Sequence, residues 1–345
     1  MSICSLRFDC AILTSCALGC VLGVSATVRA EDFSWQLSGG TSHREVGELF
    51  DADTSAIDAT YYFDPVDDTD GPYALASFFN PTTRISAAVS EDDAVPFGSG
   101  SFGTVLADGP TAYTLSGRYV WPSTQWYAGA SYSTSDVDNV LPIVRRTDPK
   151  SYSVLAGTYL GRNTTIELEA GSSTQRSETH LLCPPTPFCT SVPITAEFET
   201  DVLSLDVAHV RQVGSLTYAL YGRISQTDTD IDIRAPTVFF PGTLPTPPPP
   251  FTTVIGVIGV APVPIDLDDG FRVYSVAGEL FPIRRLGVRL GYSRPDGANI
   301  PDGDAYDLAA TWFFKPHVAM QVSVARASQG DLDTDFVALR FIGRL

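Results

Sequence analysis

The sequence has few charged residues and almost no lysine. Only 18% of the 345 residues are charged, whereas roughly 25% is usual for soluble globular domains. Lys150 and Lys315 are the only lysines, and the 22 basic residues are outnumbered by 40 acidic ones. Nucleic acid is bound through clustered positive charge, so it is not an expected partner.

Long apolar runs and helical periodicity are also missing from most of the chain. After the N-terminal segment no run of 18 or more apolar residues occurs, so no transmembrane helix is predicted. This does not exclude a β-barrel, because its membrane-spanning strands have only about 10 alternating residues each.

Residues 1–30 have the features of a secretory signal peptide. Arg7 precedes an apolar run over residues 11–24, and Val28-Arg29-Ala30 is a small-residue cleavage site. We therefore expect residues 31–345 to be the exported domain.

Cysteine is rare after the signal segment. Four of the six cysteines lie in residues 1–30, and only Cys183 and Cys189 follow. An even pair in an exported chain predicts one disulfide that stiffens a surface loop. A lipoprotein signal at Cys16, which follows Leu13-Thr14-Ser15, remains the alternative reading of the N-terminus.

Alternation of apolar and polar residues is the main signal that the sequence contains. In residues 112–121 one face carries only apolar or small side chains and the other is polar. The apolar face consists of Tyr113, Leu115, Gly117, Tyr119 and Trp121. Fourteen segments show this period of two, which is typical of half-buried β-strands.

Connection lengths give a second, independent signal. Short links occur at 122–124, 161–162, 212–214, 283–285 and 315–317, and long ones at 135–150, 174–197, 228–269 and 295–302. Their alternation is typical of outer-membrane barrels, which have short periplasmic turns and long extracellular loops. We predict an all-β fold, a transmembrane antiparallel β-barrel of about 14 strands (12–16).

Aromatic residues recur at the ends of the apolar faces, as expected for girdles at two membrane interfaces. A soluble β-sandwich or a propeller would also alternate. Neither fold requires Tyr and Trp at both ends of its strands, and no propeller-type repeat is present.

The stretch over residues 61–80, YYFDPVDDTDGPYALASFFN, resembles a porin family of Gram-negative bacteria. The shared features are a tyrosine-rich strand, an Asp-Pro turn and a segment of small residues that follows Gly-Pro. The resemblance implies an outer-membrane barrel with passive channel activity and no catalytic residues. From the residues themselves we expect a strand that ends at Phe63, a turn, and a short helix over 73–79.

The C-terminal residues alternate up to an apolar last residue. Val337, Leu339, Phe341, Gly343 and Leu345 share one face, as in the strand that the outer-membrane assembly machinery recognises. We expect the lipid bilayer and lipopolysaccharide to surround the protein. We also expect the protein to be a monomer or a trimer.

Charged residues on the polar faces of the strands are expected to line the pore. They are Arg84, Arg118, Arg223, Arg289 and Arg340 on the basic side, and Asp58, Glu167, Glu169, Asp206, Glu279 and Asp307 on the acidic side. Charges in a dry interior are costly, so this nearly balanced set favours a water-filled lumen. The alternative is a closed lumen filled by salt bridges.

Most of the excess negative charge lies in the expected extracellular loops, as in Glu91-Asp92-Asp93 and the Asp residues at 228, 230 and 232. An acidic mouth attracts cations, so we predict a weak cation preference. The run at 228–232 lacks the Gly and the distal Glu of a calcium loop, so we interpret it as a solvated face.

Three further features carry no catalytic prediction. Residues 98–103 match a dinucleotide glycine pattern, but no helical pattern follows them. His43, His180, His209 and His317 are scattered, and the nearest pair, His209 with Asp206, faces opposite sides of one strand. No cofactor, metal or enzyme activity is implied.

Loop 228–269 contains a proline-rich stretch followed by apolar residues 251–260. It could fold inward as a constriction, stand outside as a hairpin, or add two membrane strands.

The sequence thus predicts a passive outer-membrane diffusion channel for ions and small hydrophilic solutes. A structural or adhesive barrel with a plugged lumen is the alternative.

Overall fold

The computed structural model describes residues 32–47, 50–69, 71–92, 95–97, 105–107, 111–136, 144–146, 149–181, 192–234, 242–243, 255–256, 270–297, 303–330 and 332–345. The predicted signal peptide, both cysteines of the predicted disulfide and the glycine pattern at 98–103 lie outside these residues. No described helix is long and apolar enough to span a membrane.

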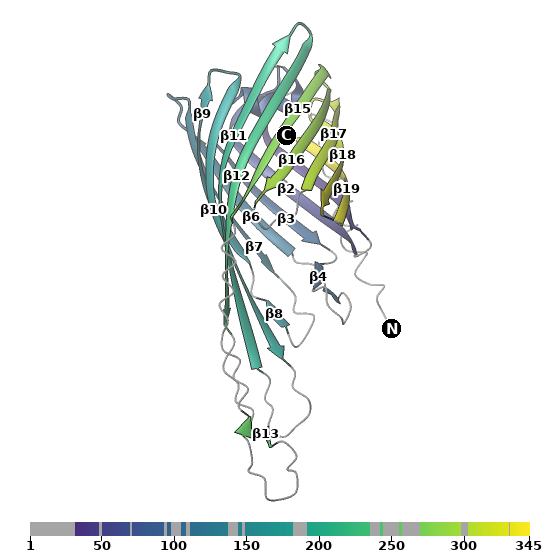
Figure 1. Cartoon of the computed structure of the whole chain (residues 1–345). Helices are drawn as coiled ribbons and strands as arrows, with labels where there is room; N and C mark the ends of the chain where they lie inside the picture. Colours follow the sequence, from purple (N-terminus) through teal and green to yellow (C-terminus); the bar gives the residue numbers. More distant parts are fainter. Residues whose placement is uncertain are drawn as a thin grey trace, which may run out of the picture.

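Fourteen long strands form the main sheet (Figure 1). They are β1 (Asp32–Val46), β2 (Phe50–Asp67), β3 (Arg84–Asp92), β6 (Thr111–Val120), β7 (Trp126–Asp136), β9 (Lys150–Leu160), β10 (Thr164–Leu181), β11 (Val192–Val213), β12 (Leu216–Arg234), β15 (Phe271–Ile283), β16 (Leu286–Asp296), β17 (Gly303–Lys315), β18 (Val318–Gln329) and β19 (Leu332–Arg344).

The other described elements are short. They are the 3-10 helix η1 (Tyr73–Leu75), the helix α2 (Ala76–Phe79), and the strands β4 (Val95–Phe97), β5 (Val105–Ala107), β8 (Val144–Arg146), β13 (Gly242–Thr243) and β14 (Ile255–Gly256). Strand β8 pairs with the outer part of β10. The pairs β4–β5 and β13–β14 form separate two-stranded sheets, so the described part of loop 228–269 adds no strand to the barrel.

The sheet closes on itself as an antiparallel barrel, which confirms the predicted fold and strand number. Each long strand pairs with its neighbours in the chain, and β19 pairs with β1 over eleven residue pairs from Gln36↔Arg344 to Val46↔Thr334. Closure satisfies the backbone donors and acceptors of what would otherwise be two open edges.

All five predicted short links lie at one end of the barrel, which we call the short-turn end. Three of them, at 214–215, 284–285 and 316–317, have only two residues. At 214–215 the turn uses Gly214 with φ of 63°, a backbone conformation that side chains with a Cβ disfavour. The long connections between strands lie at the opposite end, which we call the long-loop end.

Three strands are longer than the sequence predicts. The expected loop at 174–197 is shortened, because β10 continues to Leu181 and β11 begins at Val192. Likewise β12 runs to Arg234, so the acidic residues at 228–232 lie on a strand and not in a loop. Outside the membrane both faces of a strand meet water. Backbone hydrogen bonds between strands can therefore continue where apolar and polar residues no longer alternate, and the sequence pattern does not show where such a strand ends.

The outer face is an apolar band bounded by two aromatic rows. Exposed aromatic side chains next to the short turns are Trp35, Phe63, Tyr119, Trp121, Trp126, Trp312 and Phe314, and those nearer the long loops are Tyr113, Tyr132, Tyr152, Tyr274 and Tyr306. The rows are six to eight residues apart along β6 and β17, which is roughly 20–27 Å of strand. This spacing is close to the thickness of an outer-membrane barrel's apolar band.

The barrel seam between β1 and β19 depends on a glycine. A Cβ at Gly40 would overlap the Leu339 carbonyl oxygen and lie 2.9 Å from the Arg340 Cα, both backbone atoms. We expect Gly40→Val to destabilise the folded barrel by about 1–3 kcal/mol, the usual cost of overpacking. Urea unfolding, followed by the gel mobility of unboiled protein, measures the change.

Gly222→Ala on β12 is the matched control, because a Cβ there would meet nothing within 4 Å. Equal stability of the two variants would contradict the assigned close approach at the seam.

Candidate functional site

The predicted pore-lining residues point to the inside of the barrel, where most of them form ion pairs. Arg118 Nη2 lies 2.6 Å from Glu167 Oε2, and Arg289 Nε lies 3.7 Å from Asp307 Oδ2. Arg223 lies between two carboxylates, at 3.6 Å from Glu169 and 3.7 Å from Asp206.

The other pairs link strands elsewhere on the wall. Arg340 on β19 bonds to Asp58 on β2 at 2.5 Å and donates to Ser38 on the intervening β1. Glu279 accepts a hydrogen bond of 3.2 Å from the Tyr221 hydroxyl.

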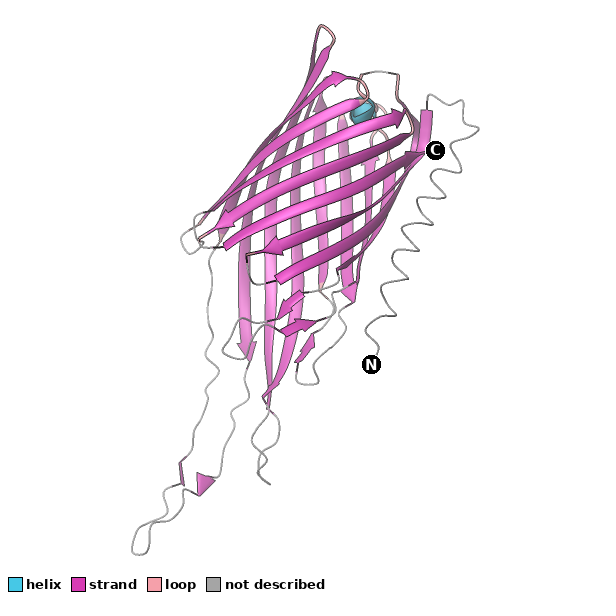
Figure 2. Cartoon of the chain, turned by 90° about the vertical axis from the view of Figure 1, so that its right-hand side faces the viewer, coloured by secondary structure: helices cyan, strands magenta, loops and turns pink. Residues whose placement is uncertain are grey.

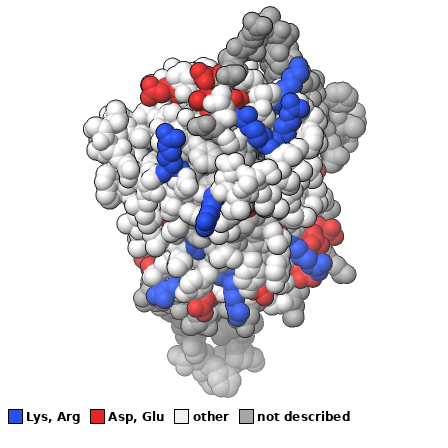
Figure 3. Space-filling view, turned by 90° about the horizontal axis from the view of Figure 1, so that it is seen from above, with Lys and Arg blue, Asp and Glu red and all other residues white. Residues whose placement is uncertain are grey.

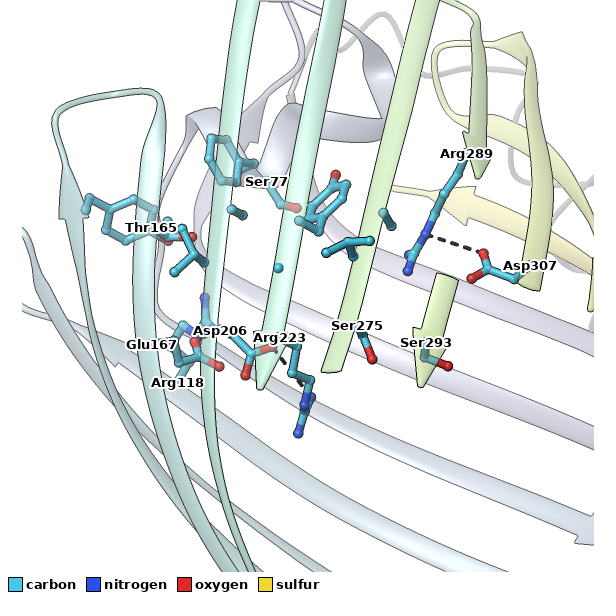
Figure 4. A pocket seen from close by; sticks show the side chains of 18 of the residues that line it. Ser77, Arg118, Thr165, Glu167, Asp206, Arg223, Ser275, Arg289, Ser293 and Asp307 are labelled. Carbon is cyan, nitrogen blue, oxygen red and sulfur yellow. Dashed lines mark hydrogen bonds and ion pairs between the residues drawn. The ribbon is translucent and has the colours of Figure 1, made fainter. Parts of the chain in front are cut away.

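One cavity of about 570 Å³ has seven of the eleven predicted residues on its lining. These are Arg84, Arg118, Glu167, Asp206, Arg223, Arg289 and Asp307. In Figure 4 the pairs Arg223–Asp206 and Arg289–Asp307 lie on neighbouring strands of one wall. The other four, Asp58, Glu169, Glu279 and Arg340, do not line this cavity. The sequence pattern predicted that all eleven face inward but did not predict which of them lie together.

The floor of the cavity is formed by the connection between β2 and β3. Ser77 and Phe78 from α2 line the cavity together with the residues of the wall. We call residues 71–80, which contain η1 and α2, the insert. The predicted short helix over 73–79 is confirmed as these two consecutive helical segments.

The insert crosses the interior of the barrel. Its consecutive residues Leu75 and Ala76 belong to two different buried clusters. Leu75 packs with residues of β11, β12 and β15, namely Val210, Ala219 and Phe281. Ala76 packs with residues of β1 and β2, namely Phe33, Tyr62 and Val66.

These two groups of strands lie on opposite sides of the barrel. Five strands separate β2 from β11 around the wall in one direction, and four separate β1 from β15 in the other. Figure 2 shows the helix inside the barrel at the short-turn end, and Figure 3, which looks onto this end, shows the area between the strand ends filled by atoms. The insert therefore occupies the lumen at the short-turn end.

Two arginines of the wall hold the backbone of the insert. Arg344 Nη1 donates to the Tyr73 carbonyl at 2.7 Å, and Arg284 Nε donates to the Gly71 carbonyl at 2.8 Å. Arg344 is 5% exposed and lies over the rings of Phe33 and Phe313 at 4.6 and 5.0 Å. The Tyr73 amide donates in turn to the Arg284 carbonyl at 3.1 Å.

The local sequence explains the path of the insert. Gly71 has φ of 78°, and a Cβ there would lie 2.7 Å from the ring of Phe79. Pro72 follows with φ of −66° and is the N-cap of η1, because its fixed φ suits a helix start. Asn80 ends α2 and donates to the carbonyls of Asp67 and Ala76 at 2.6 and 2.9 Å.

The burial of the insert was not predicted from the sequence, and the end of β2 was predicted too early. Strand β2 continues past the expected end at Phe63 to Asp67. The signal for burial was present, because Leu75, Phe78 and Phe79 are large apolar residues in a turn-like segment. Such residues need a buried partner, which a turn on the barrel surface would not provide.

A buried carboxylate precedes the insert. Asp68 is 4% exposed and its Oδ2 has no hydrogen-bond partner. Burial raises its pKa above the ordinary value of 3.8, although the nearby charges of His317, Arg284 and Arg344 act in the opposite direction. The docked insert therefore holds a carboxyl group that is easier to protonate than one in water.

His209 and Asp206, the histidine and acid considered together in the sequence, do not form a catalytic pair. The His209 ring bonds to Thr164 at 2.9 Å, while Asp206 lines the cavity on the other face of the same strand. Among the described residues no group of three or more metal-ligating side chains is found.

The fold resembles solved structures of bacterial outer-membrane proteins. The outer membrane protein Omp33 of Acinetobacter baumannii is 15% identical with a TM-score of 0.51, and the match covers 92% of this chain and 100% of that chain. The CymD monoaromatic hydrocarbon channel is 9% identical with a TM-score of 0.45, covering 91% and 89% of the two chains.

A third match is the translocator domain of the autotransporter NalP from Neisseria meningitidis, 9% identical with a TM-score of 0.42 and covering 97% and 96% of the two chains. No family model and no curated protein sequence matches this chain. The chain therefore has the fold of Gram-negative outer-membrane β-barrel proteins.

Removing the Arg344 guanidinium should loosen the insert. Arg344→Met keeps much of the side-chain volume but loses the bond to the Tyr73 carbonyl, and hydrogen bonds to a charged group contribute about 1.5–3 kcal/mol each. We expect the amides of residues 73–80 to exchange roughly 10- to 150-fold faster with deuterium. Mass spectrometry of the insert peptide measures this rate.

Arg326→Gln is the control for this variant, because Arg326 lies far from the insert and is paired with Asp333 at an exposed site. Unchanged exchange in folded Arg344→Met would show that the bond does not hold the insert.

Acid should strengthen docking of the insert through Asp68. An acid whose pKa is higher in the docked state takes up a proton on docking. Docking is therefore strongest below the ordinary pKa of 3.8 and weakens as pH rises through the raised value. Insert protection, corrected for the intrinsic exchange rate, should be stronger in acid near the ordinary pKa than at neutral pH.

Asp68→Asn should have strong protection at both pH values, because the amide mimics the protonated acid. A pH dependence that persists in this variant would assign the effect to another group.

Proposed function

We propose that the chain is a channel of a bacterial outer membrane for ions and small hydrophilic solutes, and that the insert closes its periplasmic end. The charged cavity in the lumen is the observation that carries this proposal. Arg223, Arg289 and Asp307 have 45%, 47% and 41% of their side-chain surface exposed although they point into the barrel. Charges this exposed inside a barrel indicate water in the lumen.

The width of the barrel supports a water-filled interior. Side chains just fill the interior of a barrel with about 8 strands, whereas this one has 14 strands. In the proposed orientation the short turns face the periplasm and the long loops face outward, next to lipopolysaccharide. The alternating C-terminal strand is the element that we expect the assembly machinery to bind, and the resemblance of residues 61–80 to a porin family agrees with this function.

The long-loop rim supports a weak preference for cations. Exposed acidic residues on the strand ends include Glu91, Asp228, Asp230, Asp333 and Asp335, while Arg326 neutralises part of the last pair. A rim of one sign raises the local concentration of the opposite ion. Salt screens this effect over about 8 Å under physiological conditions, so the preference is small.

The insert itself favours a second candidate, a structural or adhesive barrel with a plugged lumen. It fills the short-turn end and packs on opposite walls. The two candidates differ in whether displacement of the insert opens a passage.

Conductance in planar lipid bilayers under a potassium chloride gradient distinguishes them. Leu75 is 5% exposed within its apolar cluster, so Leu75→Asp introduces a charge that is costly to bury and should displace the insert. We expect this variant to show larger and more frequent stepwise currents than wild type, with a reversal potential that favours potassium. Leu75→Met, which preserves apolar packing, should behave like wild type.

If neither folded wild type nor folded Leu75→Asp conducts current, the channel hypothesis is rejected and the plugged barrel remains. Currents with a reversal potential that favours chloride would reject only the cation preference.

A further inference from the structure

One arginine of the cavity wall differs from all the others that line it. Arg84 begins β3 and lies directly across from Arg118 on β6 and from Tyr62 on β2. Like charges in register on one face of neighbouring strands repel each other. This pair of guanidinium groups therefore needs a compensating anion.

Among the described residues, a single carboxylate pairs with these two arginines. Glu167 bonds to Arg118 at 2.6 Å, whereas Arg84 forms no ion pair with any described residue. Its neighbours are the Tyr62 hydroxyl, Tyr159 and Arg118 itself. By contrast Arg223, Arg289 and Arg340 each have a carboxylate within 3.7 Å.

Arg118 also has an unsatisfied hydrogen-bond donor. Its Nη2 is used by Glu167, but its buried Nε has no hydrogen-bond partner. The guanidinium is held in place by stacking on Tyr127 at 4.3 Å. A buried N–H without an acceptor is unfavourable, so Glu167 satisfies the Arg118 guanidinium only in part.

The cavity that Arg84 and Arg118 line has the size and lining of a site for a small organic molecule. Its volume is about 570 Å³, within the usual range of roughly 300–1,000 Å³ for ligand pockets. Tyr127, Tyr159 and Phe78 contribute aromatic surface next to Arg84 and Arg118. On the far wall Arg223 and Arg289 are already paired with acids.

From this arrangement we infer that the cavity binds small aromatic carboxylates, with the carboxylate at the guanidinium groups of Arg84 and Arg118, and the ring against Phe78 and the tyrosines. A planar carboxylate matches the planar donor geometry of guanidinium groups. This assignment rests on the proposed function, because the cavity would then be a solute-binding site inside the channel. Phe78 belongs to the insert, so the ligand would touch the segment that closes the lumen.

Isothermal titration calorimetry on the full-length, detergent-solubilised protein tests the site, with benzoate as the probe. Benzamide has the same shape without the charge, and inorganic phosphate has charge without the ring. We expect benzoate to bind, and benzamide and phosphate to bind at least tenfold more weakly. Equal binding of benzoate and benzamide, or of benzoate and phosphate, would overturn the assignment.

Arg84→Gln should weaken benzoate binding roughly 10- to 100-fold, and Arg84→Lys should weaken it less, because the charge remains without the planar donors. Arg326→Gln at the exposed rim should bind like wild type. If Arg84→Gln folds and binds benzoate like wild type, the Arg84 guanidinium has no role in binding. If Arg84→Gln does not fold, wild-type binding by Arg84→Lys leads to the same conclusion.

The calorimetric result does not depend on conduction. Currents in the bilayer without benzoate binding would reject the ligand site and leave the channel. Benzoate binding by a protein that stays silent after displacement of the insert would reject the channel and leave the ligand site.

Discussion

The need to satisfy every backbone hydrogen bond of the wall determines the rest of this structure. An open sheet edge cannot exist in an apolar environment, so β1 and β19 must pair and the strands must form a ring. A ring of 14 strands encloses more space than inward side chains can fill. The interior must therefore contain water, or a segment of the chain, or both.

The described structure has two layers inside the ring, a packed segment of the chain and a charged layer that surrounds the cavity. At the short-turn end the insert packs against Phe33 and Tyr62 on one side and Val210 and Phe281 on the other. Next to this apolar layer lies a layer of charges, held as cross-strand pairs such as Arg118–Glu167 and Arg289–Asp307. The boundary between the layers is the cavity floor at Ser77 and Phe78, so the charged cavity directly adjoins the segment that packs across the barrel.

The sequence predicted the wall far better than the contents of the lumen. Alternation in residues 112–121 identifies the outward face, because every second side chain must match lipid, and Tyr113, Leu115 and Tyr119 are exposed there. The ends of β10 and β12 were missed where both faces meet water. The crossing of the insert was missed because it depends on contacts between Leu75 and strands more than a hundred residues away, which no local pattern encodes.

Reversible locking of the insert tests most directly whether it closes the lumen. Leu75 and Ala219 lie in one buried cluster, so a Leu75→Cys, Ala219→Cys variant, with Cys183 and Cys189 replaced by Ser, can form a disulfide between insert and wall. The account predicts no current from the oxidised protein in a planar bilayer and stepwise current after a reductant is added. Equal currents before and after reduction, with the disulfide verified by mass spectrometry, would contradict it.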